Sequence, residues 1–171
     1  MRAAALSLLA AVLSSGCGYR VAGQADLLPA KIHTIAIPAF ENGTTRYRLT
    51  QSLPTAIARE FISRTRYQVA PDERTADAVL RGAVVNYYSY PAIFDGDTGR
   101  ATGIQIIVVL SVTLVERESG KTIFERSGQS FQNRYEISTD QAAYFEESNA
   151  ALDRLSGDVA RTLVSAILED F

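Results

Sequence analysis

Four segments of this chain alternate apolar and polar residues, the pattern of half-buried β-strands. Residues 33–40, 78–90, 104–115 and 122–135 each predict a strand. Pro38 cannot donate a ladder hydrogen bond, so the first strand should be an edge strand or end there. Pro91 should end the second strand. Residues 67–71 are compatible with a short strand or with an extended link.

Residues 49–64 predict a helix, because apolar residues recur there at spacings of three and four. Thr50 is a candidate cap. Pro54 conflicts with a helix interior and predicts a late start or a bend.

A second, longer helix should begin at the capping-box sequence of residues 138–141. Its apolar stripe has helical spacing. The stripe comprises Phe145, Leu152, Leu155, Val159, Leu163, Ala166 and Ile167. Gly157 should weaken or bend this helix.

The order of these elements predicts an α+β fold, β-α-β-β-β-α, in which two helices cover one face of a mixed, mostly antiparallel four-stranded sheet. The strand-helix-strand crossover should be right-handed, so the first two long strands should be parallel.

The N-terminal segment has the layout of a secretory signal. Arg2 precedes an uncharged apolar run that extends to Leu13, and small residues follow at 14–16. The run is too short to span a bilayer as a helix, which needs roughly 20 residues. We therefore expect residues 1–16 to be a removable leader.

Cys17 directly follows this leader and is the only cysteine, so it has no partner for an internal disulfide. Small residues ending in Gly-Cys resemble the bacterial lipobox, whose cysteine becomes the lipid-modified first residue. Ser14 occupies the place where the usual pattern has Leu. The alternative is ordinary cleavage near Gly16 that leaves a free thiol. Gly18, rather than Asp, favours sorting to the outer membrane by the same resemblance.

Residues 17–171 should form one mature domain, with residues 18–31 as a tether. Without Arg2, 16 basic side chains face 19 acidic ones, a net charge of −3. This balance gives no reason to expect a nucleic-acid partner.

The motifs of enzymes are absent from the sequence, and we expect neither catalysis nor a cofactor. His33 is the only histidine, and it alternates with Ile35 and Ile37 in a strand pattern that favours a structural role. No Gly-x-Ser-x-Gly elbow or phosphate-binding glycine loop occurs. The sequence from Asp95 to Gly99 resembles the start of a calcium loop, but Ile106 replaces the required Glu, so we expect no metal.

Several segments, taken in order, resemble the LptE family of LPS-assembly lipoproteins. They are residues 17–20 (CGYR), 35–42 (IAIPAFEN), 49–50 with 59–61 (LT, REF), 67–69 (YQV), 76–82 (ADAVLRG) and 116–121 (ERESGK). This resemblance covers nearly the whole mature chain.

The resemblance implies a non-enzymatic outer-membrane lipoprotein. Such a protein sits on the periplasmic side and inside the lumen of the β-barrel LptD, which it plugs and helps to assemble. It also binds LPS at the last step of transport. Acyl chains such as palmitate on Cys17 would anchor it.

Four arginines are candidate contacts for an LPS phosphate, because guanidinium forks suit phosphate oxygens. Arg46 and Arg48 follow the first strand, Arg100 lies in the 95–100 loop, and Arg134 ends the last strand. With parallel first strands, these positions share one end of the sheet. The alternative is that they are solubilising loop charges.

Two other function classes remain open. Residues 35–42 also resemble lipoprotein activators of cell-wall synthases and curli-secretion-type channel lipoproteins. A channel former should carry further long alternating segments, and an activator usually has a longer tether. An enzyme is the third class, and it lacks a nucleophile-base pair.

Overall fold

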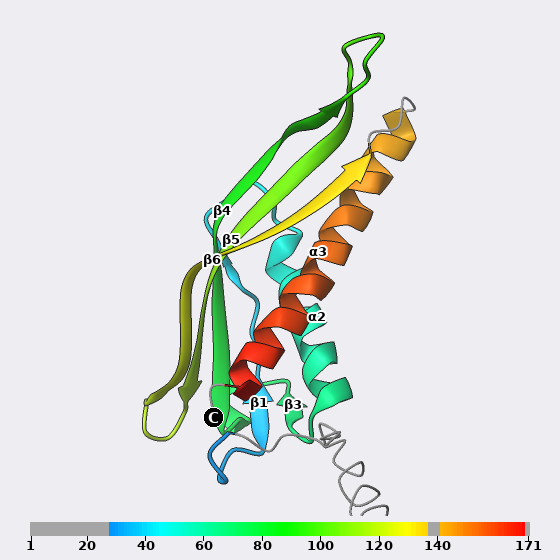
Figure 1. Ribbon diagram of the computed structural model, residues 1–171. Coiled ribbons are helices and arrows are strands. Elements are labelled where there is room, and N and C mark those ends of the chain that lie inside the picture. The colour runs from blue at the N-terminus through cyan, green and yellow to red at the C-terminus, as the bar shows by residue number, and fades with distance from the viewer. Residues whose placement is uncertain (1–27, 137–140, 170–171) are drawn as a thin grey trace, which may run out of the picture.

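The computed structural model describes residues 28–136 and 141–169, and the side chains of α3 from Ser148 on. The elements are β1 (Thr34–Ala36), β2 (Glu41–Asn42), α2 (Leu49–Arg64), β3 (Gln68–Ala70), a 3-10 turn (Glu73–Thr75), β4 (Ala78–Phe94), β5 (Ala101–Glu116), β6 (Thr122–Glu136) and α3 (Gln141–Glu169). Both helices lie on one side of the sheet (Figure 1). The α+β class and the two-helix layer are confirmed.

The sheet has six strands rather than the predicted four. Its order is β3-β1-β4-β5-β6, and β2 pairs with β4. β1 is parallel to both β3 and β4, and β2 is parallel to β4, whereas β4-β5 and β5-β6 are antiparallel. β1 and β4, which correspond to the first two strands predicted around the first helix, are therefore parallel, as predicted.

The difference between four predicted and six observed strands comes from the short strands. Of the predicted strand 33–40, only β1 forms, because residues 37–40, including Pro38, leave the ladder. β2 follows outside the predicted bounds. Residues 68–70 form β3, whose backbone pairs with β1 from Thr34 to Ala36. Strands of two or three residues are too short to show an alternating pattern.

α2 has the predicted bounds, so Pro54 does not delay its start, but its cap differs from the predicted one. The N-cap is Arg48 and makes no side-chain cap bond, so the expected capping by Thr50 was wrong. Pro54 lies inside the helix, where it has no N–H for the carbonyl of Thr50. That carbonyl instead accepts the backbone N–H of Phe40 at 3.1 Å. The proline thus leaves an acceptor that ties the β1–β2 linker to the helix.

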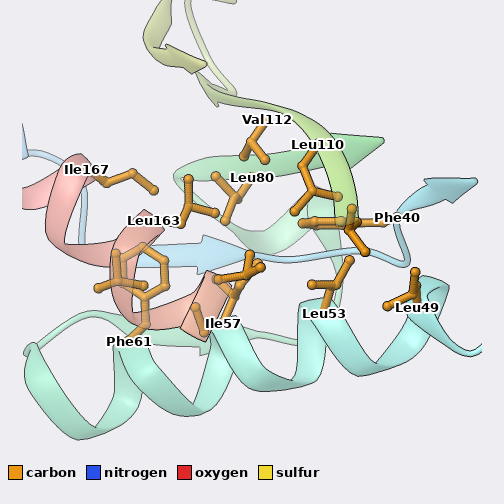
Figure 2. Close-up of a cluster of buried hydrophobic side chains, with 14 of the residues drawn as sticks. Phe40, Leu49, Leu53, Ile57, Phe61, Leu80, Leu110, Val112, Leu163 and Ile167 are labelled. Atoms are coloured by element: carbon orange, nitrogen blue, oxygen red, sulfur yellow. The ribbon is translucent and has the colours of Figure 1, made fainter. Parts of the chain in front are cut away.

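The core lies between the sheet and the two helices. On β5, every even-numbered side chain from Ile104 to Leu114 is buried, which confirms the predicted face. Figure 2 shows side chains of α2 and α3 pointing toward those of the sheet, with Phe40 between them. The apolar stripe of α3 is buried from Leu152 to Ile167, Ala166 only in part, and Gly157 does not interrupt the helix. The predicted cap at 138–140 and the side chain of Phe145 lie outside the described residues.

The β4–β5 hairpin extends beyond α2 (Figure 1). A register shift between Val84 and Asn86 inserts one residue, so Tyr87 rather than Asn86 faces the helices, opposite Val108. β4 does not end at Pro91 as predicted. Pro91 pairs with Ile104, and the strand continues to Phe94. A proline is tolerated at this position because β4 has a paired neighbour on one side only.

Candidate functional site

The start of the described chain is fixed to the body. Leu28 is buried, and its backbone N–H donates to the Tyr67 hydroxyl at 3.1 Å. Lys31 forms an ion pair with Glu116, which also accepts a hydrogen bond from the Ser119 hydroxyl at 2.6 Å. The Lys31 ammonium, aided by Ser119, holds the pKa of Glu116 below its usual value. Of the predicted tether, residues 28–31 therefore pack on the domain. Cys17 and the leader lie outside the described residues.

Asp77 joins the beginnings of β1 and β4. Its Oδ2 accepts the backbone N–H groups of His33 and Thr34 and the Thr34 hydroxyl, each at 2.9 Å. These donors, led by the His33 N–H, lower the pKa of Asp77. Thr34 Oγ1 in turn accepts the backbone N–H of Asp77. The surroundings of His33 are thus those of a strand end.

Arg46 lies against the sheet on the helix side. Its guanidinium carbon is 4.9 Å from the ring centroid of Tyr87, a cation–π contact. The turn that carries it is held by Asn42. The Asn42 side chain donates to the Arg46 carbonyl at 2.9 Å and accepts from Thr44 N–H at 2.8 Å.

Arg48 lies where α2 meets α3. Its Nη2 donates to Asp153 Oδ2 at 2.8 Å, and both side chains are about half exposed. A cavity of about 510 Å³ opens beside this pair and is lined by polar side chains of both helices, including Arg59 and Ser156. Arg48 is therefore accessible, but a carboxylate already holds it.

Arg134 lies on the opposite face of the sheet. Tyr90, Gln105 and Arg134 stand in one cross-strand row, and odd-numbered residues of this part of β5 point away from the helices. Arg134 Nε donates to Gln105 Oε1 at 3.3 Å. Arg100 lies in the β4–β5 turn, where its carbonyl accepts the Asp95 N–H at 2.8 Å.

The fold brings the four arginines to one half of the sheet but not to one cluster. Arg46 lies at the level of Tyr87, three residues before the row of Arg134, which is roughly 10 Å along the strand. Arg46 and Arg48 are on the helix side, whereas Arg134 is on the other face. Whether any of them contacts phosphate remains a prediction.

Sequence reasoning did not single out the tyrosines of β4. Tyr88 and Tyr90 are 50% and 46% exposed, and both occupy the sheet face away from the helices. Their neighbours across the sheet on that face are Gln105, Ile107, Gln132 and Arg134. The signal in the sequence was two tyrosines spaced by two in a predicted strand.

Other site types find little support in the described residues. Residues 28–136 and 141–169 hold no group of three or more His, Cys, Asp or Glu side chains suited to a metal ion. Within the same ranges, no helix carries a long enough apolar stretch to cross a bilayer.

Comparison with known proteins identifies a family and a fold. A family model named LptE and described as lipopolysaccharide-assembly matches residues 32–167. No curated protein sequence matches the chain. Several solved structures share the fold, among them three bacterial lipoproteins. Lipoprotein B from Nitrosomonas europaea is 14% identical, covers 90% of this chain and 96% of its own, and has a TM-score of 0.56.

The other two structures agree with it. A minor lipoprotein from Acinetobacter baumannii is 15% identical over 83% of this chain and 95% of its own, with a TM-score of 0.53. Rare lipoprotein B from Shewanella oneidensis is 11% identical over 80% of this chain and 95% of its own, with a TM-score of 0.51. At these identities the likeness concerns the fold alone.

Proposed function

This chain belongs to the LptE family of lipopolysaccharide-assembly proteins, and on that premise we propose that it is a lipid-anchored plug of the LPS-translocating β-barrel. In this role it helps the barrel LptD to assemble and assists the insertion of LPS at the cell surface. It does so as a non-enzymatic partner. The observation that carries the proposal is the family match, which spans residues 32–167.

The polarity of the outer sheet face supports a plug. The interior of an outer-membrane barrel is polar and water-lined. The face of β5 and β6 that points away from the helices carries Ser111, Thr113, Gln132 and Arg134 beside the apolar Ile107, Val109 and Val115. These polar side chains can hydrogen-bond to the water of such a lumen.

The anchor in this proposal is Cys17, carrying acyl chains on the periplasmic side of the outer membrane. More than one acyl chain is needed for stable anchoring. Ten residues separate Cys17 from Leu28, so the domain would lie within roughly 40 Å of its anchor.

The proposed phosphate contacts fall into two pairs. Arg100 lies in the β4–β5 turn, and Arg134 lies on the sheet face away from the helices. Arg46 and Arg48 lie just before the first residue of α2. A long lipid with several anionic groups can meet both pairs along one half of the domain. Each guanidinium would offer a charge-assisted fork to a phosphate oxygen.

The partner is tested by affinity purification of the tagged full chain from detergent-solubilised outer membranes. We expect a large β-barrel protein in a near one-to-one amount. A Cys17→Ala variant, which cannot be lipidated, should yield much less of this complex. Recovery of a cell-wall synthase, or of no barrel, would overturn the plug in favour of the activator class.

The phosphate contacts are tested separately with purified protein and LPS. Replacing Arg100 and Arg134 together by Ala should weaken binding. Arg74→Ala is the matched control, because Arg74 is exposed, pairs with Asp72 and follows β3 away from the hairpin. If the double variant and the control bind LPS equally well, Arg100 and Arg134 do not contact LPS.

A further inference from the structure

Beyond Val84, β4 has a neighbouring strand on one side only among the described residues, so its other side is a free edge. β2 pairs with β4 only at Ala83 and Val84, and the Gly43 N–H reaches the Val84 carbonyl at 3.1 Å. Beyond that point β4 pairs with β5 on one side up to Phe94. Among residues 28–136 and 141–169, no strand covers the other side.

Pro91 shows which backbone groups face this free edge. Alternate residues of a strand direct their N–H and C=O groups to opposite neighbours. Pro91 has no N–H and sits in the ladder opposite Ile104, so its backbone faces the open side. By the same alternation, Tyr87 and Ser89 present their N–H and C=O groups there. These groups are ready to pair with another strand.

This edge is uncharged and carries exposed hydrophobic side chains, a composition that favours pairing with another strand. Residues 82–94 contain no charged side chain. Of the exposed large hydrophobic side chains, five lie here: Val85, Tyr88, Tyr90, Ile93 and Phe94. Proteins normally protect free edges with charges, bulges or very short strands.

The other edges of the sheet carry those protections. β3 is only three residues long. β6 carries Glu125, Arg126, Arg134 and Glu136, and its register shifts near Gly128, whose φ is +67°. On the free edge of β4, Pro91 and the register shifts after Val84, Pro91 and Ile93 interrupt the strand, but no charge protects it, and residues 86–91 pair with β5 without a shift.

We propose that this edge, residues 87–94, pairs antiparallel with the same edge of a second copy of the chain. The uncharged segments then face each other about a two-fold axis, which is the usual symmetry of a self-complementary contact. Tyr88 and Tyr90 share one face, so the pairing sets tyrosines of both copies side by side across the new strand pair.

Charge at the two ends of the edge selects the antiparallel direction. Arg46 stands at the Tyr87 end, and at the other end the turn after Phe94 carries Asp95 and Asp97 with one arginine, Arg100, so its net charge is negative. Antiparallel pairing brings the acidic turn of each copy toward Arg46 of the other. Parallel pairing would set like charges together at both ends. The contact is small, and we expect a weak, reversible dimer.

The dimer is tested by sedimentation equilibrium of the lipidated mature chain in density-matched detergent. We expect a monomer–dimer equilibrium that Ser89→Pro and Tyr88→Lys each weaken by about tenfold or more. Ser89→Pro removes a donor that faces the open edge, so the β4–β5 ladder stays intact. Gln132→Lys is the matched control, since Gln132 stands on the same face and row as Tyr88 but two strands away.

A charge swap tests the direction. Arg46→Glu should weaken the dimer, and adding Asp97→Arg should restore it. A chain that stays monomeric at the highest soluble concentration overturns the proposal, as does a dimer equally sensitive to Gln132→Lys. Because no barrel is present in this experiment, its result is independent of the plug function.

Discussion

The ring of Phe40 fills the space above Gly82. A Cβ atom on Gly82 would lie 2.3 Å from Cε2 of Phe40, far inside contact distance. Phe40 is 2% exposed, and its backbone N–H donates a hydrogen bond to the Thr50 carbonyl. The glycine of β4 thus lets the linker between β1 and β2 close over the sheet.

Gly82→Ala should therefore destabilise the domain. The new methyl group must push a buried ring aside, and such overpacking typically costs about 1–3 kcal/mol. The free energy of unfolding in urea measures the effect. Gly96→Ala is the matched control, because no heavy atom lies within 4 Å of a Cβ at that position. Equal stability of the two variants would show that Phe40 moves freely.

Asp77 should make stability depend on pH. Its pKa is lowered in the folded state by the His33 and Thr34 donors, so its contribution is present above the unfolded pKa, about 3.9, and is lost as the pH falls through the folded pKa. Asp77→Asn should cost about 1–3 kcal/mol at pH 7.

The gap between wild type and Asp77→Asn should begin to narrow as the pH falls below about 4, where the Asp77 carboxylate of the unfolded chain takes up a proton. It should close as the pH falls further, through the lowered pKa of the folded state. Urea unfolding at pH 7 and at pH 3.5 measures it. Asp97→Asn, in the exposed hairpin turn, should stay within about 0.5 kcal/mol at pH 7. A gap that grows in acid would contradict the role of the carboxylate.

The α3 stripe should be the most sensitive part of the helix layer. Leu155 is fully buried, so Leu155→Ala removes apolar contacts and leaves a cavity, at a cost of about 2–5 kcal/mol. Ile62→Ala on α2 is the matched control, because Ile62 is 63% exposed. Chemical denaturation compares the two, and we expect the control to change stability by no more than about 0.5 kcal/mol.

Asp153 should compete with anionic ligands for Arg48. Because the pair is half exposed, Asp153→Asn should change stability by less than about 1 kcal/mol. If Arg48 meets a lipid phosphate, the variant should bind LPS roughly two- to fivefold more tightly at low salt, and the gain should fade at high salt. Asp158→Asn is the control, because Asp158 pairs with Arg161 on the same helix.

The long periodic elements were predictable, and the reasons are local. The spacing of Leu49, Leu53, Ile57 and Phe61 fixed α2 to its observed bounds despite Pro54. The alternation of β5 predicted its buried face. β2 was missed as a strand, and β3 was left open between a strand and an extended link. Their two or three residues pair through the backbone, and so short a segment shows no alternating pattern of side chains.

The candidate site was only partly predictable for another reason. The parallel first strands led us to expect the four arginines at one end of the sheet, whereas in the structure Arg46 and Arg48 lie on the helix side and Arg134 on the other face. The inserted residue between Val84 and Asn86 then decides which β4 side chains face the helices, and nothing in the alternation marks it. The partners of Arg46 and Arg48 come from segments that only the folded chain brings near, 41 residues away in sequence for Tyr87 and 105 for Asp153.

The place of β1 in the sheet sets an order of folding. β4, β5 and β6 pair with their neighbours in sequence, so their loops close early and cheaply. β1 lies between β3 and β4, and its parallel partners begin more than 30 residues later in the chain. During synthesis β1 emerges first but must wait for both of them. Its length of three residues keeps this waiting segment a poor template for aggregation.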